Sequence, residues 1–304
     1  MAGELRAGLA FRPRWFALKA DAAAAIARLT IPEYVGVVST PTFAPTLSGK
    51  ARMSDLENAG PSATGATPRP RTWDFAETLL VALLCDLAFM LTGGIAMRYV
   101  ILNYGGGWAL SATELQAVSL QGRWQGTGII LGAPAVILVL WIAIRMARRG
   151  FSEYLALNWP SGGEIVRALC LMAIVVSIEM VLMSAVGSGG YKPGPDLIVH
   201  STAGLLAMLI GSCIVAPVIE ELVVRGFIFR GWSQSFLGPN GAIVLASALW
   251  AFGHVQYDLF ERFNVFLMGL ALGYLRSSGN STWLAVIAHS AVNTFVYFSI
   301  GPYV

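Results

Sequence analysis

The chain has 304 residues, of which 56% are hydrophobic and only 12% are charged. This composition differs from that of a soluble domain and predicts a protein built for a lipid bilayer. The net charge of +3 is small and no dense basic patch or nucleic-acid-binding motif is present, which excludes a nucleic-acid-binding function. Cys85, Cys170 and Cys213 lie far apart within apolar stretches, so no disulfide framework is expected.

Residues 1–73 are expected to form a polar, cytoplasmic and partly disordered amino-terminal arm. A short helix is predicted around residues 15–29, where apolar side chains form a rough stripe that suits a membrane surface. Residues 41–71 are rich in Pro, Ser, Thr, Gly and Arg, a composition typical of a flexible linker. The first thirty residues contain no unbroken apolar stretch, so a secretory signal is not expected.

Residues 74–304 are predicted to form an all-α, polytopic transmembrane helix bundle. A bilayer core about 30 Å thick is crossed by roughly 20 helical residues. Alternation with a period of two is absent, which favours helices over a barrel. About seven spans are predicted, at residues 75–100, 126–146, 165–186, 202–229, 241–256, 259–275 and 283–300.

Basic residues near the ends of these spans predict the orientation of the bundle. Arg145, Arg148, Arg149, Arg230 and Arg276 would share one side with the basic amino-terminal arm. The positive-inside rule makes that side cytoplasmic. We therefore expect an integral protein of a bacterial cytoplasmic membrane, surrounded by membrane lipids, with its amino terminus in the cytoplasm.

The fourth predicted span contains charged residues that are costly in lipid. A charged side chain at a helix centre costs about 2.5 to 3.5 kcal/mol on insertion scales, so each one needs a reason. Glu221 and Arg225 are four residues apart and share a helix face, whereas Glu220 points about 100° away from Glu221. One carboxylate is therefore expected to pair with arginine, and the other is expected to be free for chemistry.

Two histidines lie inside later predicted spans. His254 follows Trp250 by four residues, and His289 precedes Asn293 by four. With a rise of about 1.5 Å per residue, Glu220, His254 and His289 lie roughly 16, 21 and 10 Å from the cytoplasmic ends of their spans. These three side chains are predicted to meet in the middle of the bilayer. Trp250 is interpreted as an aromatic filler of the core.

Three motifs in this part of the chain resemble those of the CAAX protease and bacteriocin-processing (CPBP) family of glutamic intramembrane proteases, which includes the type II CAAX prenyl endopeptidase. They are Glu-Glu-x-x-x-Arg at 220–225, aromatic-x-x-x-His at 250–254 and His-x-x-x-Asn at 289–293. The protease core would span about residues 165–300. The sequence departs from the family at Trp250, where Phe is usual, and at Val224, where an aromatic residue is common.

The resemblance implies an intramembrane endopeptidase whose substrate is a hydrophobic or prenylated peptide. Glu220 and His254 would activate a water molecule, and His289 and Asn293 would hold the oxyanion. The remaining predicted site residues, Glu221 and Arg225, would support this arrangement as a buried ion pair. The resemblance implies neither a metal nor a cofactor.

Three other interpretations compete with a glutamic protease. Glu220, His254 and His289 are residue types that bind catalytic zinc, although a His-Glu-x-x-His motif is absent. The second is a non-catalytic membrane scaffold, which would not explain why two Glu, an Arg, two His and an Asn lie inside the predicted spans. A transporter would explain them, but repeated halves and broken helices are not seen in the sequence.

Overall fold

The computed structural model describes residues 70–119, 121–186 and 202–300, and all regular structure within these ranges is helical. The predicted all-α fold is therefore confirmed for the described residues. The predicted helix at 15–29 and almost all of the predicted linker lie outside them.

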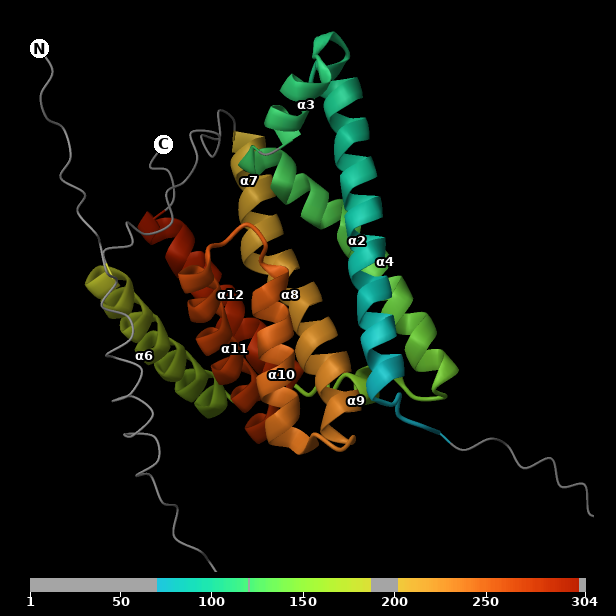
Figure 1. The fold of residues 1–304 in the computed structure, drawn as a ribbon, viewed down its shortest axis with the longest axis vertical. Helices are drawn as coiled ribbons and strands as arrows, with labels where there is room; N and C mark the ends of the chain where they lie inside the picture. Colours follow the sequence, from blue (N-terminus) through green and yellow to red (C-terminus); the bar gives the residue numbers. More distant parts are fainter. Residues whose placement is uncertain (1–69, 120, 187–201, 301–304) are drawn as a thin grey trace, which may run out of the picture. The chain divides into compact units, whose positions relative to one another are not determined.

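The first two long helices form an antiparallel pair. They are α2 (Phe75–Tyr104) and α4 (Gly122–Met146), which pack side by side over much of their length (Figure 1). Gly93 permits this approach, since a Cβ atom at this position would lie 2.7 Å from the carbonyl oxygen of Gly128. The connection contains a short 3-10 turn, η2 (Gly107–Ala109), and α3 (Ala112–Ser119), neither of which we predicted.

The short α5 (Phe151–Tyr154) leads to α6 (Gly162–Val186). This helix packs against α11 (Leu259–Gly279) and α12 (Thr282–Ile300). Only 6% of the most apolar window of α6 is buried inside the molecule. A helix with so much exposed apolar surface is suited to contact with lipid rather than water.

The fourth predicted span is one long helical segment, but its winding is not uniform. It consists of α7 (Thr202–Ile210), η4 (Gly211–Val215), α8 (Ala216–Glu221), η5 (Leu222–Ile228) and α9 (Phe229–Ser233), in which η4 and η5 are π-helical. The prediction of a regular α-helix was wrong in these two segments. Pro217 gives a physical reason for η4, because proline has no N–H and its ring clashes with the carbonyl group four residues earlier in an α-helix.

The last three helices are α10 (Gly238–Gly253), α11 (Leu259–Gly279) and α12 (Thr282–Ile300). The turn between α10 and α11 ends in a capping box, in which the Asp258 carboxylate accepts from the backbone of Glu261 and the Glu261 carboxylate accepts from the backbone of Asp258. This motif sets the start of α11 at Leu259, where the predicted sixth span begins.

Four helices in the described ranges are long and apolar enough to cross a membrane. They are Phe75–Tyr104, Arg123–Met146, Gly162–Val186 and Thr202–Ser233. The other three predicted spans correspond to α10, α11 and α12, which are shorter or more polar: α10, for example, has 16 residues. The count of seven spans therefore stays a prediction for these three helices.

Candidate active site

Glu220 lies on α8 and is held by an aromatic side chain of α10. Its Oε2 atom accepts a hydrogen bond of 2.7 Å from the indole Nε1–H of Trp250. A short bond between an N–H group and a carboxylate is stronger than one between two neutral groups. Our interpretation of Trp250 as a core filler was therefore incomplete, because this buried residue also binds the carboxylate predicted to do chemistry.

His254 follows the last residue of α10, so the helix ends three residues earlier than the predicted span. Its Nδ1 atom lies 2.8 Å from the carbonyl oxygen of Trp250. Because a carbonyl only accepts, Nδ1 carries the proton, and the lone pair of the neutral ring is on Nε2. The ring stacks on Tyr257, and Arg262 donates to the His254 carbonyl oxygen at 3.1 Å. These contacts fix the ring with Nε2 available as a base.

The predicted pair of Glu221 and Arg225 is confirmed as a buried ion pair. Arg225 Nη1 donates to Glu221 Oε1 at 3.1 Å, and His289 Nδ1 lies 2.9 Å from the same oxygen. Glu221 is 0% exposed, Arg225 2% and His289 3%. Arg225 Nη2 also donates to the carbonyl oxygen of Gly269 on α11. Buried charges of this kind are tolerated when they are paired and hydrogen-bonded, as they are here.

Asn293 lies one turn beyond His289 on α12, as the spacing predicted, but it binds a different helix. Its Nδ2 atom donates to the backbone carbonyl oxygen of Ser212, at 2.9 Å. Ser212 belongs to the π-helical segment η4, where the usual pattern of backbone hydrogen bonds changes. A side-chain amide has two N–H donors, so one remains for another acceptor.

Trp250 connects most of the predicted site residues. Besides binding Glu220, its ring meets the rings of His254 and His289 edge-on, with centroids 5.0 and 5.3 Å away. The guanidinium group of Arg225 lies over the ring, 4.5 Å from its centroid. Groups from α8, η5, α10 and α12 are thus brought together around one indole. The sequence contained a usable signal, since a buried Trp generally finds an acceptor for its N–H.

The described residues contain no group of three His, Cys, Asp or Glu side chains that could hold a metal ion. The chemistry of the arrangement is that of a carboxylate, two imidazoles and an amide.

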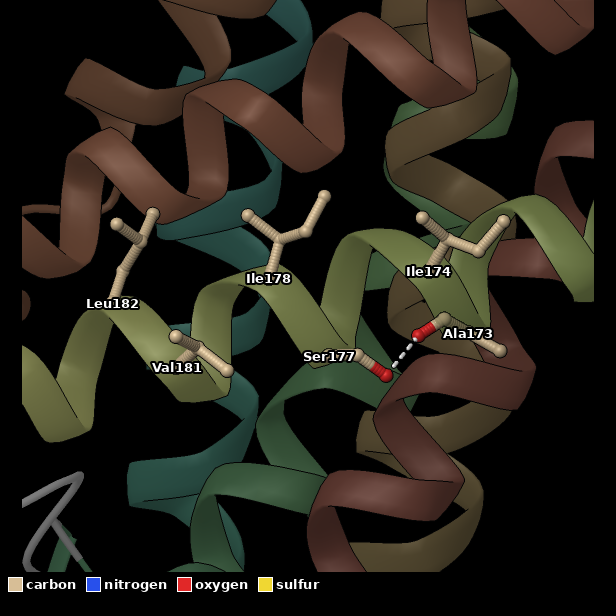
Figure 2. A pocket seen from close by; sticks show the side chains of 6 residues that line it. All are labelled: Ala173, Ile174, Ser177, Ile178, Val181 and Leu182. Atoms are coloured by element: carbon tan, nitrogen blue, oxygen red, sulfur yellow. Dashed lines mark hydrogen bonds between the residues drawn. The ribbon is translucent and has the colours of Figure 1, made fainter.

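Two cavities lie away from these residues. One, of about 460 Å³, is an apolar hollow along α6 that is shown in Figure 2. Its one hydroxyl, that of Ser177, donates to the Ala173 carbonyl oxygen. The other, of about 480 Å³, is more polar and is lined in part by Glu153, Arg230 and Asn280. None of the predicted catalytic side chains lines either cavity.

Comparisons with known proteins found a matching family model and a curated relative. Residues 202–295 match the family model described as type II CAAX prenyl endopeptidase Rce1-like. A relative from Bacillus subtilis (strain 168), described as "Putative membrane peptidase YdiL", is 27% identical over 201 residues, which cover 64% of this chain and 77% of the relative. No solved structure matches the chain. The chain is therefore an integral membrane protein, and its residues 202–295 are similar to a family of membrane proteases, in agreement with the CPBP resemblance of its motifs.

Proposed function

We propose that this chain is a glutamic intramembrane endopeptidase that hydrolyses a peptide bond of a hydrophobic or lipid-modified peptide. One observation carries the proposal: Glu220, His254 and His289, which come from three separate segments, all contact the side chain of Trp250. Ionisable groups inside a membrane are expensive and are functional by default. A scaffold needs no such cluster.

The nucleophile of the proposed reaction is a water molecule held by Glu220 and His254. The carboxylate takes a proton from the water while the water oxygen attacks the scissile carbonyl carbon. His254 accepts a hydrogen bond from the water through Nε2, because its Nδ1 proton is donated to Trp250. General-base assistance of this kind contributes typically about 10²- to 10⁴-fold to the rate.

The oxyanion of the tetrahedral intermediate would be held by His289 and Asn293. Asn293 has one N–H group left after its bond to Ser212. His289 directs Nδ1 to Glu221, so it can donate from Nε2 only as an imidazolium ion. Glu221 Oε1 contacts both this ring and the Arg225 guanidinium, so the ring is held in a fixed orientation.

Collapse of the intermediate completes the hydrolysis. The C–N bond breaks, and the proton held by Glu220 passes to the leaving amine. The water has then supplied its oxygen and one proton to the new carboxyl group and its other proton to the new amino group. No electron acceptor, metal ion or second substrate is needed for this balance.

We further propose that a prenylated peptide is the first substrate to test, because the matched family model is described as a prenyl endopeptidase. The enzyme would act in a bacterial cytoplasmic membrane with its amino terminus in the cytoplasm. Arg149 and Arg230 both donate to Glu153 Oε1, so basic residues of two segments gather at one end of the bundle. This gathering supports a cytoplasmic position for that end.

The test is cleavage of a membrane-anchored prenylated peptide by the purified full chain in lipid vesicles, read by mass spectrometry. We expect Glu220→Ala and His254→Ala to abolish turnover while Glu261→Ala, which changes a carboxylate outside the cluster, retains it. Near-normal cleavage by either of the first two variants would refute the mechanism. The transporter interpretation predicts instead that labelled peptide accumulates uncut inside the vesicles.

A further inference from the structure

Trp250 was predicted from the sequence only to fill the core. In the structure its side chain contacts four predicted site residues. The contacts differ in kind: a hydrogen bond to Glu220, edge contacts to His254 and His289, and a cation over the ring face from Arg225. A side chain that only filled the core would not need an N–H group hydrogen-bonded to a carboxylate.

The hydrogen bond restricts the carboxylate in a defined way. The indole N–H is a donor only, and its partner here is Oε2 of Glu220, at 2.7 Å. Fixing one carboxylate oxygen removes rotation about the last side-chain bond and leaves Oε1 as the oxygen that can bind water. A base works best when its reacting atom is held at the right place before the reaction begins.

The indole is itself fixed by its neighbours. Its ring face carries the Arg225 guanidinium, which is fixed in turn by Glu221 and by the carbonyl oxygen of Gly269. A cation above the ring and histidine edges beside it leave the indole, which is 7% exposed, little room to turn. The buried ion pair thus acts on Glu220 through Trp250.

We propose that Trp250 is a positioning residue of the proposed peptidase reaction: its indole N–H holds Oε2 of Glu220, so that Oε1 is presented to the attacking water. This inference rests on the proposed function. In the CPBP motif that this chain resembles, the usual residue at this position is Phe, which has no N–H donor. The hydrogen bond to Glu220 is therefore a property of this chain and not of the motif.

The test compares two Trp→Phe variants of the full chain in lipid vesicles, with the prenylated peptide as substrate. Trp250→Phe keeps an aromatic ring but removes the donor, and we expect kcat to fall by about 10- to 100-fold, as for a hydrogen bond to a charged group. KM should stay unchanged, because the lost interaction acts on the base and not on the peptide. Trp232→Phe is the matched control, since its buried indole donates to the Phe75 carbonyl oxygen instead.

A second variant separates the hydrogen bond from the size of the ring. Benzothienylalanine at position 250 replaces the indole N–H by sulfur and preserves the bicyclic shape, so it should lower kcat as Trp250→Phe does. Ultraviolet resonance Raman spectra report the hydrogen bond directly. The indole N–H band of Trp250, obtained by subtracting the Trp250→Phe spectrum, should shift when Glu220 is changed to Ala.

The outcomes separate this inference from the function on which it rests. If Glu220→Ala is inactive but Trp250→Phe or the benzothienyl variant has the wild-type kcat, the positioning role is wrong and the proposed function stands. A higher KM with unchanged kcat also overturns it. If Glu220→Ala remains active, both the positioning role and the proposed function are wrong. A loss of kcat in the two position-250 variants, without a loss in Trp232→Phe, supports the positioning role.

Discussion

The buried ion pair of Glu221 and Arg225 allows stability and activity to be separated by mutation. Removing one partner leaves the other charge buried, with exposures of 0% and 2%. Such a loss costs about 3–5 kcal/mol, whereas replacing both partners with apolar residues is often neutral or stabilising. We therefore expect Glu221→Leu and Arg225→Met each to lower the melting temperature, and the double variant to recover most of the loss.

The size of the effect follows from the size of the bundle. For a protein of about 150–250 residues, 1 kcal/mol corresponds to about 2–4 °C, so each single variant should melt about 6–20 °C lower. Thermal unfolding of the purified chain in detergent measures this shift. A melting temperature for either single variant within about 2 °C of wild type would refute the buried pair.

The double variant should nevertheless fail in catalysis. His289 donates Nδ1 to Glu221, and leucine at position 221 offers no acceptor. The ring would lose the hydrogen bond that orients it. A stable double variant with normal peptide cleavage would show that Glu221 does not position His289.

Three further outcomes are expected. Gly93→Ala should lower the melting temperature, because the new Cβ atom would lie 2.7 Å from the Gly128 carbonyl oxygen. Gly94→Ala, at the next position of α2, should leave the melting temperature unchanged, because its Cβ atom would meet nothing within 4 Å. Equal effects of the two substitutions would contradict the close approach of α2 and α4. Asn293→Ala should lower kcat by about 10²- to 10³-fold with little change in KM, in a steady-state cleavage assay; an unchanged kcat would remove the amide from the oxyanion site. Turnover should survive exhaustive dialysis against a chelator, and a loss that zinc restores would favour the metal interpretation.

Local features of this site could be predicted from sequence, and features that depend on packing between helices could not. The Glu221 and Arg225 pair is confirmed because a separation of four residues is slightly more than one helical turn, which places the two side chains on one face whatever surrounds the helix. The contact between Trp250 and Glu220 joins residues thirty positions apart, and its geometry depends on how α8 and α10 pack. The spacing rules that found the motifs hold no information on that packing.

Helix ends show a similar division. The capping box of Asp258 and Glu261 was readable in the sequence, and the start of α11 at Leu259 agrees with the predicted span. The end of α10 was not found, because residues 254–256 are compatible with a helix in composition and only the structure shows His254 leaving it. The brief α3 and α5 were missed since neither is long enough for an apolar period to stand out.

The two π-helical segments have a consequence for how the carboxylates are aimed. Each residue of an α-helix turns the chain by about 100°, so one extra residue accommodated in a wider turn changes the direction of every side chain that follows it. Glu220 and Glu221 lie between two such turns, in the six-residue α8. The directions of their side chains, toward the Trp250 indole and the His289 imidazole, therefore depend on the winding of η4, which precedes them. Deleting one residue from η4 would turn both carboxylates away from these partners without changing the Glu-Glu-x-x-x-Arg motif, whereas η5 contains Arg225 of the motif itself.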